Sequence, residues 1–264
     1  FVSCSSHKET TKDLSEKNKE EIRITLNDNV VFKNLGPKIN TEYNEFGSAI
    51  TGNGKILYFT SNRPNRFSEE GDEDIWYSVK EGEEWGLSKN LGFPINDKGN
   101  QGTTAIQPDG QFVYFALPQR EDGYGNFDLY YSRLEGLRWT EPINLGPVVN
   151  SPYWDHNPTI SSDGRTLIFA SNRPGGYGNS DLWITFKDNE GNWSKPQNLG
   201  PNINTSGQEM SPFLSLDNKT LYFSSNSGPG VGGFDIFVSQ YNNGVWSLRK
   251  NIGEPYNSPE DEYF

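Results

Sequence analysis

The chain has 264 residues with Gly 28, Pro 16 and 14% aromatic residues, a composition that suits many short strands joined by tight turns. Its net charge of −12 excludes a nucleic-acid-binding role, because phosphate binding requires a basic face, and it favours cationic partners. No stretch approaches the length of about 18 apolar residues that a membrane-spanning helix needs.

The first residues predict a lipid anchor and a tether. Phe1-Val2-Ser3-Cys4 is similar to the end of a bacterial lipoprotein signal, in which small residues precede a lipidated cysteine. Residues 1–21 are therefore expected to be a signal remnant, lipidated at Cys4, and a flexible tether whose polar composition cannot bury a core. The alternative is that Cys4 is an ordinary residue of a tail. Contact with a membrane is expected only through this lipid.

A recurring tripeptide predicts the architecture of residues 22–264. The sequence Asn-Leu-Gly, and once Asn-Ile-Gly, recurs at intervals of 56, 54, 54 and 53 residues, beginning at Asn34, Asn90, Asn144, Asn198 and Asn251. Such a period is typical of a propeller or a solenoid. The region is therefore expected to be one repetitive β domain.

Each repeat predicts four antiparallel strands. In the third repeat, residues 156–160 and 166–170 flank a hairpin turn at Asp163-Gly164, residues 181–186 form a third strand, and residues 193–198 form an outer one. The third strands open with an aspartate that is expected to fix the glycine-rich turn before it: Asp74, Asp128, Asp181 and Asp235. A tryptophan stands five residues before each of the last four repeat asparagines, where we expect it to pack between blades: Trp85, Trp139, Trp193 and Trp246.

The two ends of the repeat region predict a shared blade. Residues 22–26 and 30–33 read as the outer strands of a blade, and residues 258–264 begin a further inner strand. A blade joined from both termini would remove exposed sheet edges. The sequence thus predicts an all-β propeller of four-stranded antiparallel blades, five in number, or six if the chain continues past Phe264.

Two segments carry a resemblance to a known family. Ser61-Asn62-Arg63-Pro64 and the Ser-Asn-Arg-Pro-Gly-Gly-Tyr-Gly of residues 171–178, each with a downstream Asp-(Ile/Leu)-Trp, resemble the WD-like propeller repeats of TolB. Similar repeats occur in envelope lipoproteins that carry OmpA-like peptidoglycan-binding domains. The resemblance implies a periplasmic or outer-membrane lipoprotein of a Gram-negative-type bacterium. The second repeat departs from it at Leu117-Pro118-Gln119-Arg120, and the fourth, Ser225-Asn226-Ser227, lacks the arginine.

One repeated position predicts a site. Nine residues after the repeat glycines stand Glu45, Gln101, Asp155, Glu209 and Glu262. Equivalent positions of stacked blades form a ring, so these residues, with His156 beside them, predict a ligand-binding acidic collar at the mouth of the central channel. The collar should raise its own pKa values or hold a cation such as calcium, and no other cofactor is expected. The alternative is a structural latch, in which each acid accepts backbone N–H groups of the next blade.

These features favour a non-catalytic binding or scaffolding propeller of the cell envelope. It would recognise a protein or peptide partner, or a cation, at its central funnel. The alternative is a carbohydrate-active hydrolase that uses Glu45, Asp155 and Glu209 as central carboxylates. His156 is the one candidate acid–base residue or metal ligand of the propeller, and an incidental loop histidine is the alternative. A purely structural propeller that supports a further C-terminal domain is a third possibility.

Overall fold

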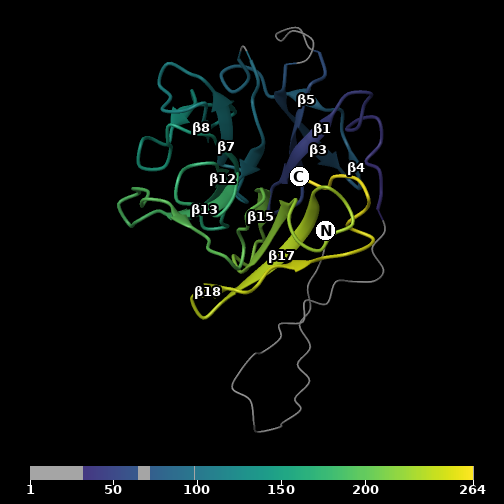
Figure 1. Ribbon diagram of the computed structural model, residues 1–264. Coiled ribbons are helices and arrows are strands. Elements are labelled where there is room, and N and C mark those ends of the chain that lie inside the picture. Colours follow the sequence, from purple (N-terminus) through teal and green to yellow (C-terminus); the bar gives the residue numbers. More distant parts are fainter. Residues whose placement is uncertain (1–31, 65–71, 98, 264) are drawn as a thin grey trace, which may run out of the picture. The chain divides into compact units, whose positions relative to one another are not determined.

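The computed structural model describes residues 32–64, 72–97 and 99–263 (Figure 1). The chain divides into two units, residues 1–33 and 34–264, and the fold below is that of the second unit. The predicted signal remnant and tether, with Cys4, and the predicted strand at 22–26 lie outside the described residues. Of the strand predicted at 30–33, residues 30 and 31 also lie outside them, and residues 32 and 33 form no strand. No helix in the described parts of the chain is long and apolar enough to cross a membrane.

Four antiparallel blades of one design follow one another along the chain. Blade 1 contains β1 (Glu45–Ile50), β2 (Ile56–Ser61), β3 (Asp74–Glu81), β4 (Glu84–Trp85) and β5 (Lys89–Asn90). Blade 2 contains β6 (Thr104–Ile106), β7 (Phe112–Pro118), β8 (Phe127–Glu135), β9 (Arg138–Trp139) and β10 (Ile143–Asn144). Blade 3 contains β11 (Asp155–Ile160), β12 (Thr166–Ser171), β13 (Asp181–Phe186) and β14 (Gln197–Asn198). Blade 4 contains β15 (Glu209–Leu214), β16 (Thr220–Ser225), β17 (Asp235–Asn242), β18 (Val245–Trp246) and β19 (Lys250–Asn251).

This arrangement confirms the predicted all-β propeller of four-stranded antiparallel blades. The first strands of successive blades lie against one another, β1 on β6, β6 on β11 and β11 on β15, so they are the innermost strands of the propeller. The blades follow each other from blue through teal and green to yellow in Figure 1. At the C-terminal end, residues 258–263, predicted to begin a further inner strand, form no strand.

The outer strand is shorter than the sequence predicts. In blades 1, 2 and 4 it consists of two pieces of two residues each: the first pairs with the C-terminal end of the third strand, and the second pairs with a stretch nearer the strand's beginning or middle. Between the pieces, a buried hydroxyl of the third strand donates to a carbonyl oxygen, as Ser78 Oγ does to Gly86 at 2.8 Å and Ser132 Oγ to Thr140 at 2.6 Å. This side-chain hydrogen bond adds to a main-chain bond between the two pieces, such as that from the Gly86 N–H to the Val79 carbonyl at 2.9 Å.

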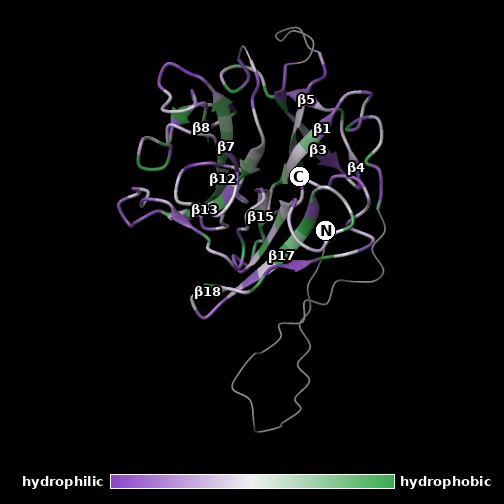
Figure 2. Ribbon diagram, in the orientation of Figure 1, coloured by the Kyte–Doolittle hydropathy of each residue, from purple (hydrophilic) through white to green (hydrophobic). Residues whose placement is uncertain are grey.

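The hydrophobic core lies between the blades. One cluster joins blades 1 and 2, a second joins blades 2 and 3, and a third joins blades 3 and 4. Three of the repeated tryptophans pack in these clusters, as predicted, whereas Trp85 packs in a fourth cluster, formed by blade 1 and the loop before it. Trp139 of blade 2 meets Tyr58 of blade 1 edge to face, with ring centroids 6.4 Å apart. Figure 2 shows the hydrophobic residues mostly on the strands and the hydrophilic ones mostly in the connecting loops. Since each blade covers its neighbour's apolar face, stacking supplies the burial that a single blade lacks.

The aspartate at the start of the third strand fixes the turn before it, as predicted. Asp181 accepts hydrogen bonds from the N–H groups of Tyr177 at 2.6 Å and Gly178 at 3.0 Å. A Cβ on Gly176 would lie 2.2 Å from a carboxylate oxygen of Asp181, so only glycine fits there. Asp128 and Asp235 hold their turns in the same way. The turn before Asp74 lies partly outside the described residues.

A second repeated asparagine secures each crossover between blades. Asn150 donates to the Leu129 carbonyl at 3.0 Å and to Asn144 Oδ1 at 2.8 Å, and its own Oδ1 accepts the Leu129 N–H at 2.8 Å. The same bracket recurs at three further asparagines, each six residues after its repeat asparagine: Asn96, Asn204 and Asn257. One buried side-chain amide in each crossover loop thus satisfies both main-chain groups of a third-strand residue and ties the loop to that strand.

Replacing Asn150 by alanine is expected to lower the free energy of unfolding by about 2–4 kcal/mol, because the buried N–H and C=O of Leu129 lose their partner. Urea unfolding followed by tryptophan fluorescence measures the change. Asn242→Ala, at an exposed end of β17, is the matched control and should shift stability by less than about 0.5 kcal/mol. Equal effects of the two substitutions would contradict the bracket.

Candidate binding face

The sequence differences between the blades that are described below all lie at one end of the propeller. At this end the first strand of each blade begins, the second ends and the third begins. Its described residues are the crossover loops 36–44, 92–97 with 99–100, 146–154, 200–208 and 253–261, and the turns 119–126, 173–180 and 227–234. We call this end the latch face.

Blade 3 shows the basic contact of the latch face. Asp155 is fully buried, and one of its oxygens accepts hydrogen bonds from the N–H of Ser151 at 2.6 Å and from its hydroxyl at 2.8 Å. The other oxygen accepts a hydrogen bond of 2.5 Å from Arg173, which also donates to the Val149 carbonyl at 2.7 Å. The carboxylate therefore ties the incoming crossover loop to the turn between the second and third strands.

Blade 1 repeats this contact. Glu45 accepts from the Thr41 N–H at 2.9 Å, from Ser61 at 3.1 Å and from Arg63 at 2.8 Å. Burial raises the pKa of Glu45, but the hydrogen bonds from Thr41 and the charge of Arg63 outweigh burial, so the pKa lies below its ordinary value. Of the two outcomes expected for the collar, a raised pKa is therefore not found at this residue, because the negative charge has donors beside it, and a bound cation stays a prediction.

Blade 4 supplies the arginine from another place in the chain. The fourth repeat has Ser227 where blades 1 and 3 have arginine, and the sequence therefore predicts no such contact. Arg249, two residues before the repeat asparagine, reaches Glu209 at 3.1 Å and Ser225 at 2.9 Å. It also donates to the Ser227 carbonyl. Glu209, which is fully buried, thus has the same kind of partner as Glu45 and Asp155.

Blade 2 reaches the same result by an exchange of two residues. Gln101 stands in the acid position, and Asp97 stands where the other crossovers have serine or threonine. Gln101 Nε2 donates to Asp97 at 3.0 Å, and Arg120 pairs with the other oxygen of Asp97 at 2.6 Å. Moving the carboxylate by four residues thus keeps one arginine–carboxylate pair in this blade.

The four acids among the predicted collar residues share one role in the structure: each carboxylate bonds to its own crossover loop, as Glu262 does with the Ser258 N–H at 3.1 Å. Gln101 has no carboxylate and instead donates its amide to Asp97 of that loop. The latch alternative describes this geometry most closely, although the N–H groups come from the crossover loop and not from the next blade. The main chain does link blades here: the N–H of Glu209 donates to the Ser180 carbonyl of blade 3 at 2.8 Å. Ligand binding at the collar stays a prediction.

The arginines of these pairs also lie over aromatic rings. Arg63 lies 4.8 Å from the Trp76 ring centroid, and Arg249 lies 4.6 Å from that of Phe237. Such contacts favour a guanidinium over an ammonium, because its flat face stacks on the ring while its edge donates to the carboxylate. The aromatic ring and the carboxylate thus both favour arginine over lysine at this position.

His156 lies beside Asp155 in sequence but bonds elsewhere. Its Nδ1 contacts the Asn157 side-chain oxygen, and burial lowers the pKa of the imidazole, so it is neutral at pH 7. Asn157 has a left-handed backbone with φ 48° at a bulge of β11, and its amide donates to Thr103 of blade 2 at 2.7 Å. Within the described residues no group of three or more His, Cys, Asp or Glu side chains could hold a metal ion.

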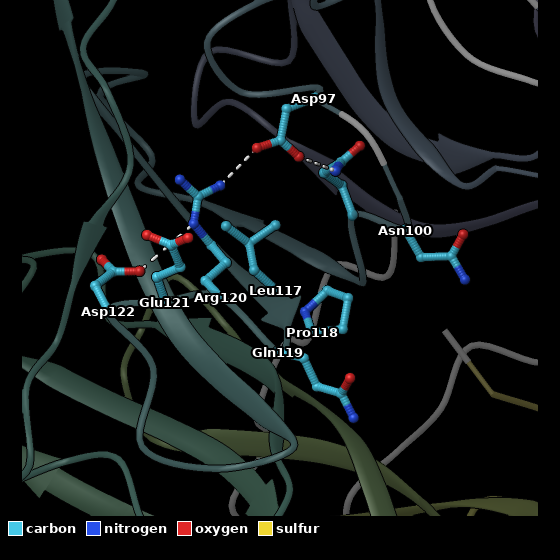
Figure 3. Close-up of a pocket in the computed structure, with 9 residues that line it drawn as sticks. Asp97, Asn100, Leu117, Pro118, Gln119, Arg120, Glu121 and Asp122 are labelled. Carbon is cyan, nitrogen blue, oxygen red and sulfur yellow. Dashed lines mark hydrogen bonds and ion pairs between the residues drawn. The ribbon is translucent and has the colours of Figure 1, made fainter.

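A cavity opens where blade 2 departs from the repeat. In the other blades an asparagine after the second strand accepts the N–H of the residue before the acid position, as Asn172 does from Trp154 at 2.9 Å. Blade 2 has Pro118 there, which has no side-chain acceptor. A cavity of about 480 Å³ lies at this point, and Figure 3 shows its lining side chains around Arg120. They are Asp97, Asn100, Gln101, Leu117, Pro118, Gln119, Arg120, Glu121 and Asp122.

Exposed aromatic side chains gather on the latch face. Four of the six exposed tyrosine and tryptophan side chains of the described residues lie in its loops and turns: Tyr124, Tyr153, Trp154 and Tyr177. The fifth, Tyr263, stands two residues beyond the last of these loops. The sixth, Tyr241, lies near the other end of β17. Among these residues only Tyr124 and Tyr177 stand at equivalent repeat positions, four residues before Asp128 and Asp181, so the repeat pattern alone does not reveal the set.

The arrangement of blades can be compared with solved structures. TolB from Acinetobacter baumannii is similar with a TM-score of 0.56 and 15% identity, over 84% of this chain and 47% of that one. The fold is that of the TolB propeller. A putative TolB from Agrobacterium tumefaciens gives a TM-score of 0.52 and 15% identity over 82% of this chain and 69% of that one. The chain thus spans about half the length of the Acinetobacter TolB.

The same fold occurs in proteins of other names. GH43B of the Bacteroides ovatus xyloglucan PUL gives a TM-score of 0.52 and 15% identity, over 84% of this chain and 43% of that one. No protein-family model matches the sequence, and no curated protein sequence matches it significantly. The similarities therefore establish the propeller fold, which hosts many functions.

The pH dependence of stability tests the surroundings of His156. Because burial lowers its folded-state pKa, the unfolded chain binds the proton more readily, so stability is lost as pH falls below about 6.5. From pH 7.5 to 5, wild type should lose more unfolding free energy than His156→Gln. Urea unfolding at a series of pH values measures the difference. Parallel curves for the two proteins would show that this imidazole is not held neutral.

Proposed function

We propose that this protein is a non-catalytic binding propeller of the bacterial cell envelope, which recognises a protein or peptide partner on its latch face. The observation that carries the proposal is the gathering of exposed tyrosine and tryptophan on that face. These residue types dominate the binding energy of protein interfaces, because they bury a large area and lose little side-chain entropy. The chain's net charge of −12 favours a partner with a basic surface and speeds its approach.

The loops that carry these aromatic residues are held in place before any partner arrives. The turn of blade 2 lies directly on the crossover loop of blade 3: the Asn126 N–H donates to the Tyr153 carbonyl at 3.3 Å. A Cβ on Gly125 would lie 2.3 Å from that same carbonyl oxygen. Tyr124 and Tyr153 are therefore presented by two loops in tight contact. Such preorganisation lowers the ordering cost of binding.

The envelope location rests on the N-terminal sequence and on the fold. Residues 1–21 read as a lipoprotein signal remnant and tether, and a lipid on Cys4 would hold the propeller at the outer membrane, facing the periplasm. The TolB-type fold supports this assignment. A partner in the envelope is then within reach of the tethered propeller.

The geometry gives little support to the alternative of a carbohydrate-active hydrolase. That chemistry needs two carboxylates about 5–10 Å apart that face an open, sugar-sized cleft. Asp155 and Glu209 are fully buried, and each is paired with an arginine. Glu45, the third candidate, is paired with Arg63. A hydrolase also needs one carboxyl group as the acid and another as the base or nucleophile, and these roles require different environments, whereas the three carboxylates here have equivalent ones.

Site-specific photo-crosslinking tests the proposed face. A benzoylphenylalanine in place of Tyr153 or of Tyr177 should give the same discrete crosslinked protein in the organism that makes the full chain. The matched control is the same replacement of Tyr241, which is similarly exposed at the other end of a blade. It should give no such product.

Two outcomes would contradict the proposal. One is crosslinking from Tyr241 that equals that from the latch face, or no crosslinking from the latch face. The other is release of reducing sugar from envelope or plant polysaccharides by the pure protein, with the activity lost in Asp155→Asn. The second outcome would favour the hydrolase.

A further inference from the structure

The cavity of blade 2 is a product of its altered sequence. In blades 1, 3 and 4 a Ser-Asn pair stands at the end of the second strand. In blades 1 and 4 the serine hydroxyl donates to the carboxylate at the acid position. In all three blades the asparagine Oδ1 accepts the main-chain N–H of the residue that precedes the acid position. Blade 2 has Leu117-Pro118 in their place. Neither side chain can bond to the crossover loop, so loop and turn stay apart at this one position. Gln119 follows with a left-handed backbone of φ 37°, a strained conformation typical of functional sites.

A buried acceptor without a partner lines this cavity. Gln101 is 1% exposed, and its Nε2 is fixed by Asp97 at 3.0 Å. That bond identifies the other end of the amide as the oxygen. Gln101 Oε1 has no hydrogen-bond partner among the described residues. A buried carbonyl oxygen in this state requires a donor, and the cavity is the space from which one can come.

The charges of the lining select a cation. Three carboxylates, those of Asp97, Glu121 and Asp122, face one guanidinium. Arg120 lies between Asp97 at 2.6 Å and Asp122 at 3.6 Å, as Figure 3 shows, so its charge is already compensated. An anion would meet a net negative lining. A donor group that carries a positive charge satisfies both the lining and the free oxygen of Gln101.

The remaining walls select the shape of that cation. Leu117 and Pro118 give an apolar wall beside the polar groups. A lysine side chain has this same division, with an aliphatic stem and an ammonium that offers three donors. We propose that the blade 2 cavity is a subsite for a lysine side chain of the peptide partner. This inference rests on the proposed function of the latch face and names the partner's chemistry at one point of it.

Binding of a small lysine peptide to the full chain tests the subsite. Acetyl-Gly-Lys-Gly-amide is titrated into protein labelled with ¹⁵N at glutamine side chains, and the Gln101 and Gln119 amide resonances are followed. We expect saturable shifts with lysine. The peptides with norleucine or Nε-acetyl-lysine keep the stem but lack the charge, and should bind at least tenfold more weakly. Equal shifts with norleucine, or saturation of the same resonances by Ca²⁺ but not by the lysine peptide, would overturn the proposal.

Matched variants distinguish lysine binding in the cavity from non-specific attraction to the negatively charged protein. Glu121→Gln with Asp122→Asn should weaken lysine binding at least tenfold. Glu83→Gln with Glu84→Gln removes the same charge from an exposed turn of blade 1 and should leave binding unchanged. Equal weakening by both pairs would overturn the subsite. Glu121 is exposed, so Glu121→Gln alone keeps the test valid if the double variant fails to fold.

Restoring the repeat gives an independent test. Leu117→Ser with Pro118→Asn supplies the pair found in the other blades, which should bond to the crossover loop and close the cavity. Lysine-dependent shifts should then disappear while the protein stays folded, with a lower melting temperature because Leu117 is a fully buried core side chain. Unchanged binding in this variant would place the lysine elsewhere. If lysine binding fails while crosslinking from Tyr153 and Tyr177 persists, the subsite is wrong and the binding face stands; if both fail, both proposals fall.

Discussion

An ion pair between a carboxylate and an arginine holds the latch face of each described blade, largely buried in blades 1, 3 and 4 and partly exposed in blade 2, and the rest of the structure depends on it. The crossover loop enters from the preceding blade with its N–H groups turned inward, and the carboxylate accepts them. Leaving either charge without its partner in such a place costs about 3–5 kcal/mol. The chain therefore keeps the pair in every described blade, although the residues that form it change: Glu45–Arg63, Asp97–Arg120, Asp155–Arg173 and Glu209–Arg249.

Function, in this account, arises where the repeat is broken. Blades 1, 3 and 4 close their loops with the same hydrogen bond, which runs from the main-chain N–H before the acid position to the asparagine after the second strand; we call this bond the clasp. It makes the latch face rigid and presents its aromatic residues in fixed positions. Blade 2 keeps the ion pair but loses the clasp at Pro118, so a cavity opens without loss of the fold. A repeat architecture tolerates such a change because each blade is stabilised by its neighbours as well as by its own bonds.

Much of this could be predicted from the sequence, because the period of the Asn-Leu-Gly tripeptide marks the blades and fixes the register of Asp181 and its equivalents. The bracketing asparagine, such as Asn150, was missed, although it repeats at the same intervals and the signal was available. Arg249 could not be predicted, since it replaces an arginine 22 residues away from its own position and only the fold brings it to Glu209. The exchange of Asp97 and Gln101 was hidden in the same way, because a comparison of single positions does not show that two of them have traded roles.

The most direct test of this account moves the arginine of blade 4 back to the position used by blades 1 and 3. Arg249→Ser, which installs the residue that blade 1 has at this point, should lower the free energy of unfolding by about 3–5 kcal/mol. Adding Ser227→Arg should restore stability to within about 1 kcal/mol of wild type, measured by urea unfolding of the full chain. A double variant no more stable than Arg249→Ser alone would contradict the claim that the latch face requires one arginine–carboxylate pair in each blade, whichever part of the chain supplies it.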